Sequence, residues 1–455
     1  MKLKNKTVAV IGLGEKTGVE TVKFLAQQQA DIIVSDTKTS QELAAQLEEL
    51  AGIEFKADLA GHTPKLLLTA DIFVVSPGVP TEITIIKQAR QAGIEVISEI
   101  ELAYRFNQSC LVGITGTNGK TTTTTLLGQI FKVAYPHQVA VGGNIGRPLI
   151  KDLPYLSKKD CAIAEISSFQ LELIDQFRVK IALLLNLTPD HLKRHGDLDS
   201  YIQAKQRLFK NQKASDYTVL NYDDPIIKGF AELTAGEVIY FSQESELDRG
   251  AFVKDGQIVT KINHNLEKII AVNQLGIKGP HNLENALAAV AVAKLLGIDN
   301  ASLKKVLKSF SGVEHRIEIL APLNEVVYVN DSKGTNPAAT KKALATFDDG
   351  IILIAGGKDK GSDFFELLKV GQGKIKSLIL LGETAKEIAK TAKKLDYQVI
   401  HQVESIKQAV NLANDLSTAG DVVLLSPACS SLDMFANYKE RGELFKKAVA
   451  DLRRK

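Results

Sequence analysis

Residues 116–121 read Gly-Thr-Asn-Gly-Lys-Thr, a glycine loop whose residue types and spacing could bind phosphate groups. The loop follows the apolar run Leu111–Ile114 and precedes a threonine-rich stretch, which predicts a strand before it and a helix after it. In such a loop, backbone N–H groups converge on phosphate oxygens, the lysine reaches the terminal phosphates and the last threonine can bind Mg²⁺. The strict pattern would begin with a glycine at position 114, where the chain has Ile114, so the loop is a variant. The alternative is an ordinary turn between a strand and a helix.

Acidic and imidazole side chains follow two further apolar runs. Glu165 ends the run that starts at Cys161, and the polar stretch 186–191, which ends at His191, follows the run Ile181–Leu185. Because the carboxyl ends of parallel strands meet at one edge of a sheet, both side chains could bind cations there, and a second cation is plausible. An exposed strand-end acid and a structural histidine are the alternatives. A phosphate loop beside metal ligands predicts phosphoryl chemistry, which hydrolases, kinases, motors and ligases share.

A second glycine turn lies near the amino terminus. Gly12, Gly14 and Gly18 follow the run Val8–Ile11, and Asp36 ends the next apolar run, as in a dinucleotide-binding fingerprint. The third glycine of the strict pattern would be residue 17, which is Thr17. The turn alone therefore leaves open a nicotinamide nucleotide site, another nucleotide site, and a turn that only packs a helix on a strand.

The elements that must position these residues alternate between short β-branched runs and longer helical patterns, which is typical of α/β folds with parallel sheets. The alternation falls into three blocks, with linkers near residues 107–110 and 311–315. We therefore predict three domains at residues 1–108, 109–312 and 313–455, with a P-loop ATPase-like parallel sheet between two Rossmann-like domains. The expected strands are Val8–Ile11, Ile32–Ser35, Ile72–Ser76, Glu95–Ile97, Leu111–Ile114, Cys161–Ile166, Ile181–Leu185, Tyr217–Leu220, Glu325–Val329, Ile351–Ala355, Ser377–Leu381, Tyr397–Ile400 and Asp421–Leu425. The expected helices include Glu99–Phe106, Asn282–Leu296 and Ser302–Phe310.

Composition excludes several other classes of protein. The 56 basic and 53 acidic residues give a formal charge of +3 and are scattered, so nucleic acid is not an expected partner. No apolar run approaches the length of about 20 residues that a membrane span needs. The first apolar run is also too short for the core of a signal peptide. The three cysteines stand beside apolar runs, as buried reduced thiols do. We expect a cytoplasmic protein with no membrane span.

Together these motifs resemble those of the Mur ligase superfamily, whose members join amino acids to a carboxylate through an acyl phosphate made with ATP. The resemblance runs through all three predicted domains. It is carried by Gly116–Thr121, Gly143-Asn144-Ile145-Gly146, Glu165–Gln170, Asp190-His191, His281-Asn282 with Asn285, His315-Arg316 and Asp331–Asn336. Within the superfamily, Asp331–Asn336 and Leu425–Phe435 are most similar to the members that add D-glutamate to UDP-N-acetylmuramoyl-L-alanine.

The resemblance implies a role for individual residues. Lys120, His191 and Lys205 would be catalytic, and Lys205 matches a lysine that is carbamylated in the family. Two Mg²⁺ ions would be bound by Thr121, Glu165, His191 and carbamylated Lys205. ATP would be bound by Gly116, Thr117, Asn118, Gly119, Lys120, Thr121, Asn282, Asn285, Arg316 and Asp331. From the residues alone, Lys205 would be a solvated helical lysine.

The same resemblance implies two substrate pockets. The UDP substrate would be bound by Lys16, Thr17, Asp36, Thr37, Ser76, Pro77, Gly78 and Asn144. D-Glutamate would be bound by Lys333, Thr335, Lys360, Ser431 and Tyr438, although the family more often has Phe where Tyr438 stands. Because these residues are spread over all three predicted domains, we expect the third domain to close over the site. The alternatives are a related ligase that adds glutamate to a folate, and a nicotinamide-dependent oxidoreductase or binding protein built on the Gly12 turn.

Overall fold

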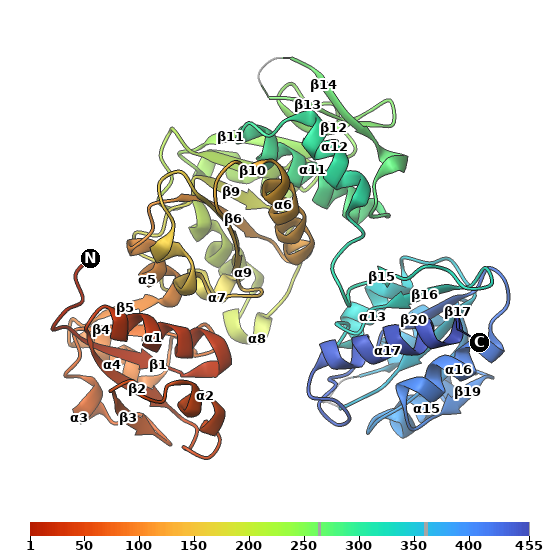
Figure 1. Cartoon of the computed structure of the whole chain (residues 1–455), viewed down its shortest axis with the longest axis horizontal. Coiled ribbons are helices and arrows are strands. Elements are labelled where there is room, and N and C mark those ends of the chain that lie inside the picture. Colours follow the sequence, from red (N-terminus) through yellow and green to blue (C-terminus); the bar gives the residue numbers. More distant parts are fainter. Residues whose placement is uncertain (263–264, 359–362, 455) are drawn as a thin grey trace. The chain divides into compact units, whose positions relative to one another are not determined.

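The structure is a computed structural model that describes residues 1–262, 265–358 and 363–454. It divides into two compact units, Met1–Phe310 and Ser311–Lys455. In the described residues the strands form three sheets, and each sheet is covered by helices (Figure 1). The α/β fold class and the three sheets expected from the sequence are therefore confirmed, whereas the predicted domain boundaries stay predictions.

The first sheet has five parallel strands in the order β3-β2-β1-β4-β5. Its strands are β1 (Thr7–Ile11), β2 (Asp31–Asp36), β3 (Lys56–Leu59), β4 (Ile72–Val75) and β5 (Glu95–Ser98). The helices are α1 (Val19–Gln27), α2 (Ala44–Glu49), α3 (Pro64–Leu67), α4 (Thr84–Gln91) and α5 (Glu99–Arg105), and a π-helical turn, η1 (Gly14–Gly18), leads into α1. β1 and β4 are almost entirely buried, which is why they are continuous runs of apolar residues rather than alternating ones.

The central sheet has nine strands in the order β14-β13-β12-β11-β10-β9-β6-β8-β7. They are β6 (Cys110–Thr115), β7 (Val139–Gly143), β8 (Cys161–Glu165), β9 (Ile181–Leu184), β10 (Tyr217–Asn221), β11 (Glu237–Ser242), β12 (Gly250–Lys254), β13 (Gln257–Lys261) and β14 (Glu267–Ala271). Its helices are α6 (Lys120–Ala134), α7 (Ser168–Leu171), α8 (Leu192–His195), α9 (Leu198–Gln206), α10 (Pro225–Lys228), α11 (Pro280–Leu295) and α12 (Asn300–Ser309). The sheet is parallel from β7 to β12, but β12, β13 and β14 form an antiparallel meander that the sequence analysis did not predict. α6 and α11 pack against each other beside this sheet (Figure 1).

The first and central sheets belong to one unit, and α5 joins them. The Glu101 carboxylate, which is fully buried, accepts hydrogen bonds from the backbone N–H groups of Asp175, Gln176 and Phe177. Glu99 accepts one from Ile150 N at 2.7 Å, in the 3₁₀ turn Leu149–Lys151 (η2). A single apolar cluster also runs from the first sheet into the central one. These contacts hold the two sheets of this unit together.

The second unit contains a six-stranded sheet in the order β15-β16-β20-β17-β18-β19. Its strands are β15 (Glu318–Ile319), β16 (Val327–Asn330), β17 (Ile351–Ala355), β18 (Ile375–Leu380), β19 (Ile400–Gln402) and β20 (Val422–Leu425). Its helices are α13 (Pro337–Leu344), α14 (Phe365–Gly371), α15 (Ala385–Lys394), α16 (Ile406–Leu416) and α17 (Tyr438–Leu452). All neighbours are parallel except β15 and β16. The prediction of a strand at Tyr397–Ile400 was wrong in position along the sequence, because β19 begins where the predicted strand ends.

Two of the three cysteines are neighbours in space. Cys110 and Cys161 start the adjacent parallel strands β6 and β8 and are paired in register. All three cysteines are free thiols, as expected; Cys161 and Cys429 are buried and Cys110 is partly exposed. The hydrogen bond between the two neighbouring thiols lowers the pKa of Cys110, and the nearby Lys180 charge lowers it further.

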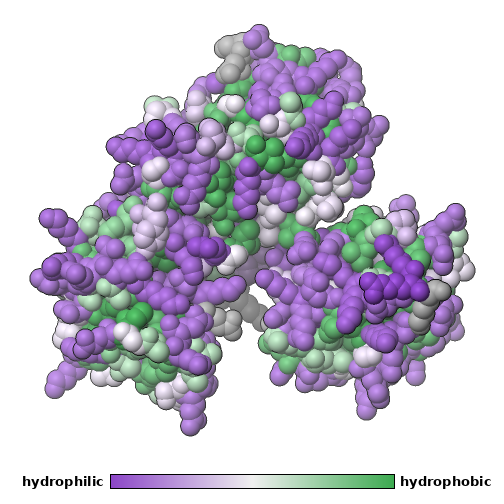
Figure 2. All heavy atoms as spheres, in the orientation of Figure 1, coloured by the Kyte–Doolittle hydropathy of each residue, from purple (hydrophilic) through white to green (hydrophobic). Residues whose placement is uncertain are grey.

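Figure 2 shows hydrophilic side chains over most of the visible surface, with hydrophobic ones in scattered groups between them. Among the described residues, no helix combines the length and the apolar character that a membrane crossing requires.

Candidate functional site at the glycine loop

The glycine loop connects β6 to α6, as its sequence predicts. Two of its glycines are required by close approach. Gly119 has φ +80°, and a Cβ there would lie 2.2 Å from Asn285 Oδ1, while Gly116 has φ +148° and a Cβ there would lie 3.1 Å from Leu185 Cβ. Any side chain at these positions would strain the backbone, and it would crowd the Asn285 side chain or the segment that follows β9. The loop therefore packs closely between α11 and the segment after β9.

The segment after β9 fixes the shape of the loop. The Asn186 carbonyl accepts a hydrogen bond from Thr117 N at 2.9 Å, and its side-chain oxygen accepts one from Asn118 N at 2.8 Å. The Thr117 hydroxyl exchanges hydrogen bonds with the backbone of Thr188 and lies 3.0 Å from the Tyr201 hydroxyl. Backbone and side-chain groups of this segment thus fix the conformation of the loop, and such preorganisation lowers the entropy cost of binding.

Two lysines meet at the carbonyl oxygen of Gly116. Lys120 Nζ donates to it at 2.8 Å, and Lys205 Nζ, from α9, also donates to it at 2.8 Å. Lys205 is only 1% exposed, so the prediction from the residues alone of a solvated lysine is wrong. Burial and, to a smaller extent, the charge of Lys120 lower the pKa of Lys205 to about 7, against the opposing charges of Asp190 and Glu165. The structure therefore brings together Lys120 and Lys205, which the resemblance named as catalytic.

Glu165 lies at the end of β8 and is almost completely buried. The residue is 2% exposed, and its Oε1 accepts a hydrogen bond from Asn144 Nδ2 at 2.7 Å. Its Oε2 is buried and has no hydrogen-bond partner among the described residues. An unpaired buried carboxylate oxygen is costly, and a hard divalent cation would satisfy it. The geometry thus fits the predicted role of Glu165 in binding Mg²⁺.

His191, just before α8, has a strained backbone conformation with φ +53°. Its ring packs 5.0 Å from that of Phe169, and its Nε2 lies 3.6 Å from an Asp190 carboxylate oxygen. The side chain is 53% exposed, which leaves it accessible to a ligand. Its assignment as a metal ligand stays a prediction.

Asn282 and Asn285 belong to α11, and Asn285 lies against Gly119 of the loop. Asn285 is buried, donates from Nδ2 to Asn282 Oδ1 at 3.3 Å, and accepts a hydrogen bond from the Thr123 hydroxyl at 3.1 Å. Of the predicted ATP-binding residues, the structure thus brings the loop and these two asparagines together, while Arg316 and Asp331 belong to the other compact unit.

The predicted UDP pocket surrounds the amino-terminal glycine turn. Lys16 and Thr17 lie in η1, and Thr37 is exposed just after β2. The Asp36 carboxylate accepts hydrogen bonds from the backbone N–H groups of Leu13 and Lys38, so it shapes the turn. On the other side, the Ser76 hydroxyl donates to the Gly12 carbonyl at 2.6 Å, and Pro77 and Gly78 follow it. Asn144, predicted for the same substrate, donates a hydrogen bond to Glu165 at the end of β8.

In the second unit, the predicted D-glutamate residues lie on two loops after β16 and β20. Lys333 and Thr335 belong to the first loop, Ser431 to the second, and Tyr438 begins α17. Asp331 is buried, and its carboxylate accepts a hydrogen bond from the Ser426 hydroxyl at 2.7 Å, which ties the two loops. Burial raises the pKa of Asp331 to about 6, although the Ser426 hydrogen bond opposes the shift. Lys360 lies outside the described residues.

Arg441, which the sequence analysis missed, joins the same two loops. It is 1% exposed, and its guanidinium donates to the Ser332 hydroxyl and carbonyl and to the Cys429 carbonyl. Asn186 was predicted only as part of the polar stretch 186–191, without its role in shaping the loop. The sequence did contain one indication that Arg441 lies near the site, because it stands one helical turn after Tyr438. It does not show, however, which polar residues become buried.

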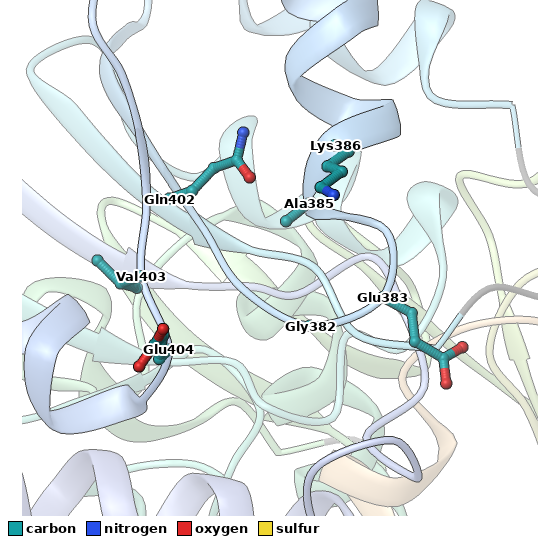
Figure 3. Close-up of a pocket in the computed structure, with 7 residues that line it drawn as sticks. All are labelled: Gly382, Glu383, Ala385, Lys386, Gln402, Val403 and Glu404. Carbon is teal, nitrogen blue, oxygen red and sulfur yellow. The ribbon is translucent and has the colours of Figure 1, made fainter.

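Two other features of the second unit border these loops: the His315 carbonyl accepts a hydrogen bond from Lys333 N, and the Glu383 N–H donates to Asp433. Glu314, His315 and Glu443 are close enough to bind a metal ion, but the Lys446 ammonium already pairs with both acids, at 3.2 and 3.0 Å. A pocket of about 480 Å³ opens where β18 and β19 end, and its walls include Lys386 of α15 and Gln402 of β19 (Figure 3). None of the predicted site residues lines it.

Family comparisons match all three sheets. Residues 6–98 match the Mur ligase MurD-like N-terminal domain, residues 114–293 the Mur ligase middle domain, and residues 315–429 the Mur ligase glutamate ligase domain. The solved structures that it resembles share the fold at low identity. They include MurF from Acinetobacter baumannii, with a TM-score of 0.59 and 16% identity over 93% of this chain and 91% of that one. They also include the UDP-N-acetylmuramate-alanine ligase of Thermotoga maritima, with a TM-score of 0.57 and 19% identity over 98% and 100%.

Full-length relatives are much more similar in sequence. The UDP-N-acetylmuramoylalanine--D-glutamate ligase of Thermoanaerobacter pseudethanolicus is 47% identical over 456 residues, which cover 100% of both chains. The protein of the same name from Clostridioides difficile is 45% identical, again over 100% of both chains. With this similarity along its whole length, and with a phosphate loop flanked by Lys120, Lys205 and Glu165, the chain belongs to the Mur ligase family.

Proposed function

We propose that this protein is an ATP-dependent ligase that adds D-glutamate to UDP-N-acetylmuramoyl-L-alanine, a cytoplasmic step of peptidoglycan precursor synthesis. The observation that carries the proposal is the full-length identity of 45–47% to ligases named for this reaction. The geometry of the glycine loop supports it, because a phosphate loop with two lysines and an unpaired buried carboxylate oxygen suits the transfer of a phosphoryl group.

The proposed reaction has two steps. A carboxylate oxygen of the alanyl group attacks the terminal phosphorus of ATP, a P–O bond forms, and ADP leaves. The D-glutamate amine then attacks the acyl carbon, an amide bond forms, the amine loses a proton and inorganic phosphate leaves.

The first step brings anions together, so it requires positive charge at the loop. In this proposal Lys120 neutralises the transferred phosphoryl group, and the Asn186 contacts hold the backbone N–H groups of the loop in place. Thr121, Glu165, His191 and modified Lys205 would hold two Mg²⁺ ions, which would supply further charge neutralisation when bound. Arg316 and Asp331 would contact the nucleotide from the second unit, and Lys333, Thr335, Lys360, Ser431 and Tyr438 would bind D-glutamate.

Carbamylation of Lys205 is part of the proposal. The Lys205 ammonium first loses one proton. The neutral amine then adds carbon dioxide, an N–C bond forms and a second proton is lost, so that an anion replaces the original cation. A buried cation that shares the Gly116 carbonyl with Lys120 is unfavourable, whereas an anion at this position would face the Lys120 charge. Burial beside Lys120 therefore supports the assignment that the family resemblance suggested.

A phosphate-release assay tests the function. Purified protein with ATP, Mg²⁺ and UDP-N-acetylmuramoyl-L-alanine should release phosphate only when D-glutamate is added. The Lys120→Met variant should lose turnover but still bind UDP, because Lys120 belongs to the central sheet and the Gly12 turn to the first sheet. Equal release with L-glutamate, or with no acceptor, would refute the proposed acceptor.

The alternatives predict different ligands. A ligase acting on folates has no use for a UDP pocket, and an oxidoreductase or binding protein built on the Gly12 turn would bind NADH in preference to UDP. The match of residues 6–98 to the MurD-like N-terminal domain favours the UDP substrate. Calorimetric titrations with UDP and with NADH separate these cases.

A further inference from the structure

Arg194 makes contacts on both sides of the junction between the first and central sheets. It belongs to α8, which directly follows His191. Its Nη2 donates to the carbonyl oxygen of Val79 at 2.9 Å. It also pairs through two nitrogens with the Glu172 carboxylate, at 2.7 and 3.3 Å. Both charged side chains are mostly buried, with 19% and 15% exposed.

On the first side, Val79 belongs to the wall of the predicted UDP pocket. It directly follows Ser76, Pro77 and Gly78, and its N–H donates to the Ser76 carbonyl at 3.0 Å. Its side chain packs closely against the glycine turn, since a Cβ on Gly12 would lie only 2.5 Å from Val79 Cγ2. A shift of Val79 would therefore move both walls of the pocket.

On the second side, Arg194 contacts the segments that follow Glu165 and His191. Its guanidinium lies 5.1 Å from the centre of the Phe169 ring, and that ring packs against His191. The neighbouring His195 ring stacks on Phe169 at 5.4 Å, and its Nε2 lies 3.0 Å from the Ser168 hydroxyl. One side chain thus connects the Val79 carbonyl to the cluster that carries the predicted metal ligands.

Only an arginine can make this set of contacts. A guanidinium has five N–H donors in a plane, so it can bind a carboxylate with two nitrogens, donate to a carbonyl and stack on a ring at the same time. A lysine ammonium in the same place is a point charge and would lose either the two-nitrogen pair or the Val79 bond.

The junction does not need Arg194 in order to hold together. Glu101 binds three backbone N–H groups of residues 175–177, and the shared apolar cluster spans the two sheets. Removing Arg194 should therefore leave the two sheets docked and release only the turn at residues 76–79.

We propose that Arg194 is a positioning residue that sets the wall Ser76–Val79 of the UDP pocket against the segments that carry Glu165 and His191. It fixes the distance between the place where the UDP group binds and the place where the substrate carboxylate meets ATP. The inference rests on the proposed function for the identity of the substrate, but the mechanical link itself does not.

The first test is kinetic and uses Arg194→Lys and Arg194→Met, with Arg90→Met as the matched control. Arg90 forms a surface pair with Glu82 at 3.7 Å and is 44% exposed. We expect the KM for the UDP substrate to rise about tenfold or more in both Arg194 variants, as for loss of a charge-assisted hydrogen bond. The KM for ATP should change by less than about twofold, which is within the effect of a lost surface contact. Unchanged KM values, or equal rises for both substrates, would overturn the proposal.

The second test needs no activity. Hydrogen exchange followed by mass spectrometry should show faster exchange of the Val79 amide region in Arg194→Met, with residues 175–177 as protected as in the wild type. Faster exchange in both segments would mean that Arg194 only supports the junction, and slow exchange in both would mean that it does not hold the turn. If the wild type bound no UDP substrate, the proposed function would be wrong, while the exchange result would still decide the role of Arg194.

Discussion

Lys120 and Lys205 direct two ammonium groups at one carbonyl oxygen, although the side chains come from helices far apart in the sequence. Lys120 follows from the loop pattern. Lys205 does not, because its burial depends on tertiary contacts, such as those of its ammonium with Thr115 and Gly116, and not on any local signal. Among residues of one type, burial beside another charge therefore separates a functional lysine from the many solvated ones.

The carbamylation proposal can be tested at Lys205 itself. With isotope-labelled bicarbonate, carbon NMR of the wild type should show a carbamate resonance that is absent in Lys205→Arg, because a guanidinium does not add carbon dioxide. The variant should also lose turnover. Lys210→Arg is the control, since Lys210 is exposed near the end of the same segment and should change neither the resonance nor the rate. A carbamate signal that survives in Lys205→Arg would refute the assignment.

Glu99 gives a prediction about stability. Burial raises the pKa of Glu99 to about 7, although the Ile150 N–H opposes the shift. Because the folded-state pKa lies above the unfolded one, folding favours the protonated form, and stability decreases as pH rises from about 4.5 through about 7. A glutamine is neutral at every pH and can still accept the Ile150 hydrogen bond, so Glu99→Gln should be more stable above the folded pKa.

We expect Glu99→Gln to raise the free energy of unfolding by on the order of 1–3 kcal/mol at about pH 8, with the gain shrinking toward about pH 4.5. Urea unfolding at several pH values measures the effect. Glu82→Gln should change it by less than about 0.5 kcal/mol, because Glu82 is a surface acid with 71% exposure. A gain that is equal at all pH values would contradict a buried, titrating carboxyl.

At the level of elements, the two parallel strands β6 and β8 bring Cys110 and Cys161 together at one end and the glycine loop and Glu165 together at the other. Of the three thiols, Cys110 should react first with iodoacetamide in the native protein. It is the one that is partly exposed, and the hydrogen bond with the Cys161 thiol lowers its pKa, which increases the reactive thiolate.

Peptide mass spectrometry after brief alkylation measures the order of labelling. In Cys110→Ser, Cys161 should remain slow, because it is fully buried and burial raises the pKa of its thiol. If Cys429 were labelled before Cys110, the environment of the β6–β8 pair would differ from the one described.

The individual strands and loops differ in how far they could be predicted from the sequence. Buried parallel strands such as Ile351–Ala355 are continuous apolar runs, so they could be located closely. The strand β7 contains two glycines in five residues, and the meander β12–β14 has no strong apolar run, so tertiary pairing rather than local pattern decides them. The glycine loop could be predicted because its chemistry is local, whereas Asn186, Arg194 and Arg441 act through contacts distant in the sequence.

At the scale of the whole molecule, the residues that the family resemblance assigns to the reaction come from both compact units. Lys120 and Glu165 belong to the first, and Asp331 and Lys333 to the second. The proposed reaction needs residues of both units at one phosphoryl group, and water must be kept from the acyl phosphate. Binding of all substrates should therefore favour one compact arrangement over others.

Small-angle X-ray scattering measures this directly. With Mg²⁺, a nonhydrolysable ATP analogue, the UDP substrate and D-glutamate, the radius of gyration should fall toward about 22 Å, the value for a single compact body of this length. UDP alone should have no such effect, because its predicted pocket lies within the first unit. Lys120→Met should bind UDP yet fail to compact with the full set of ligands, since the nucleotide phosphates would no longer be neutralised. An unchanged radius with all ligands bound in a protein that turns over normally would show that closure of the second unit is not required.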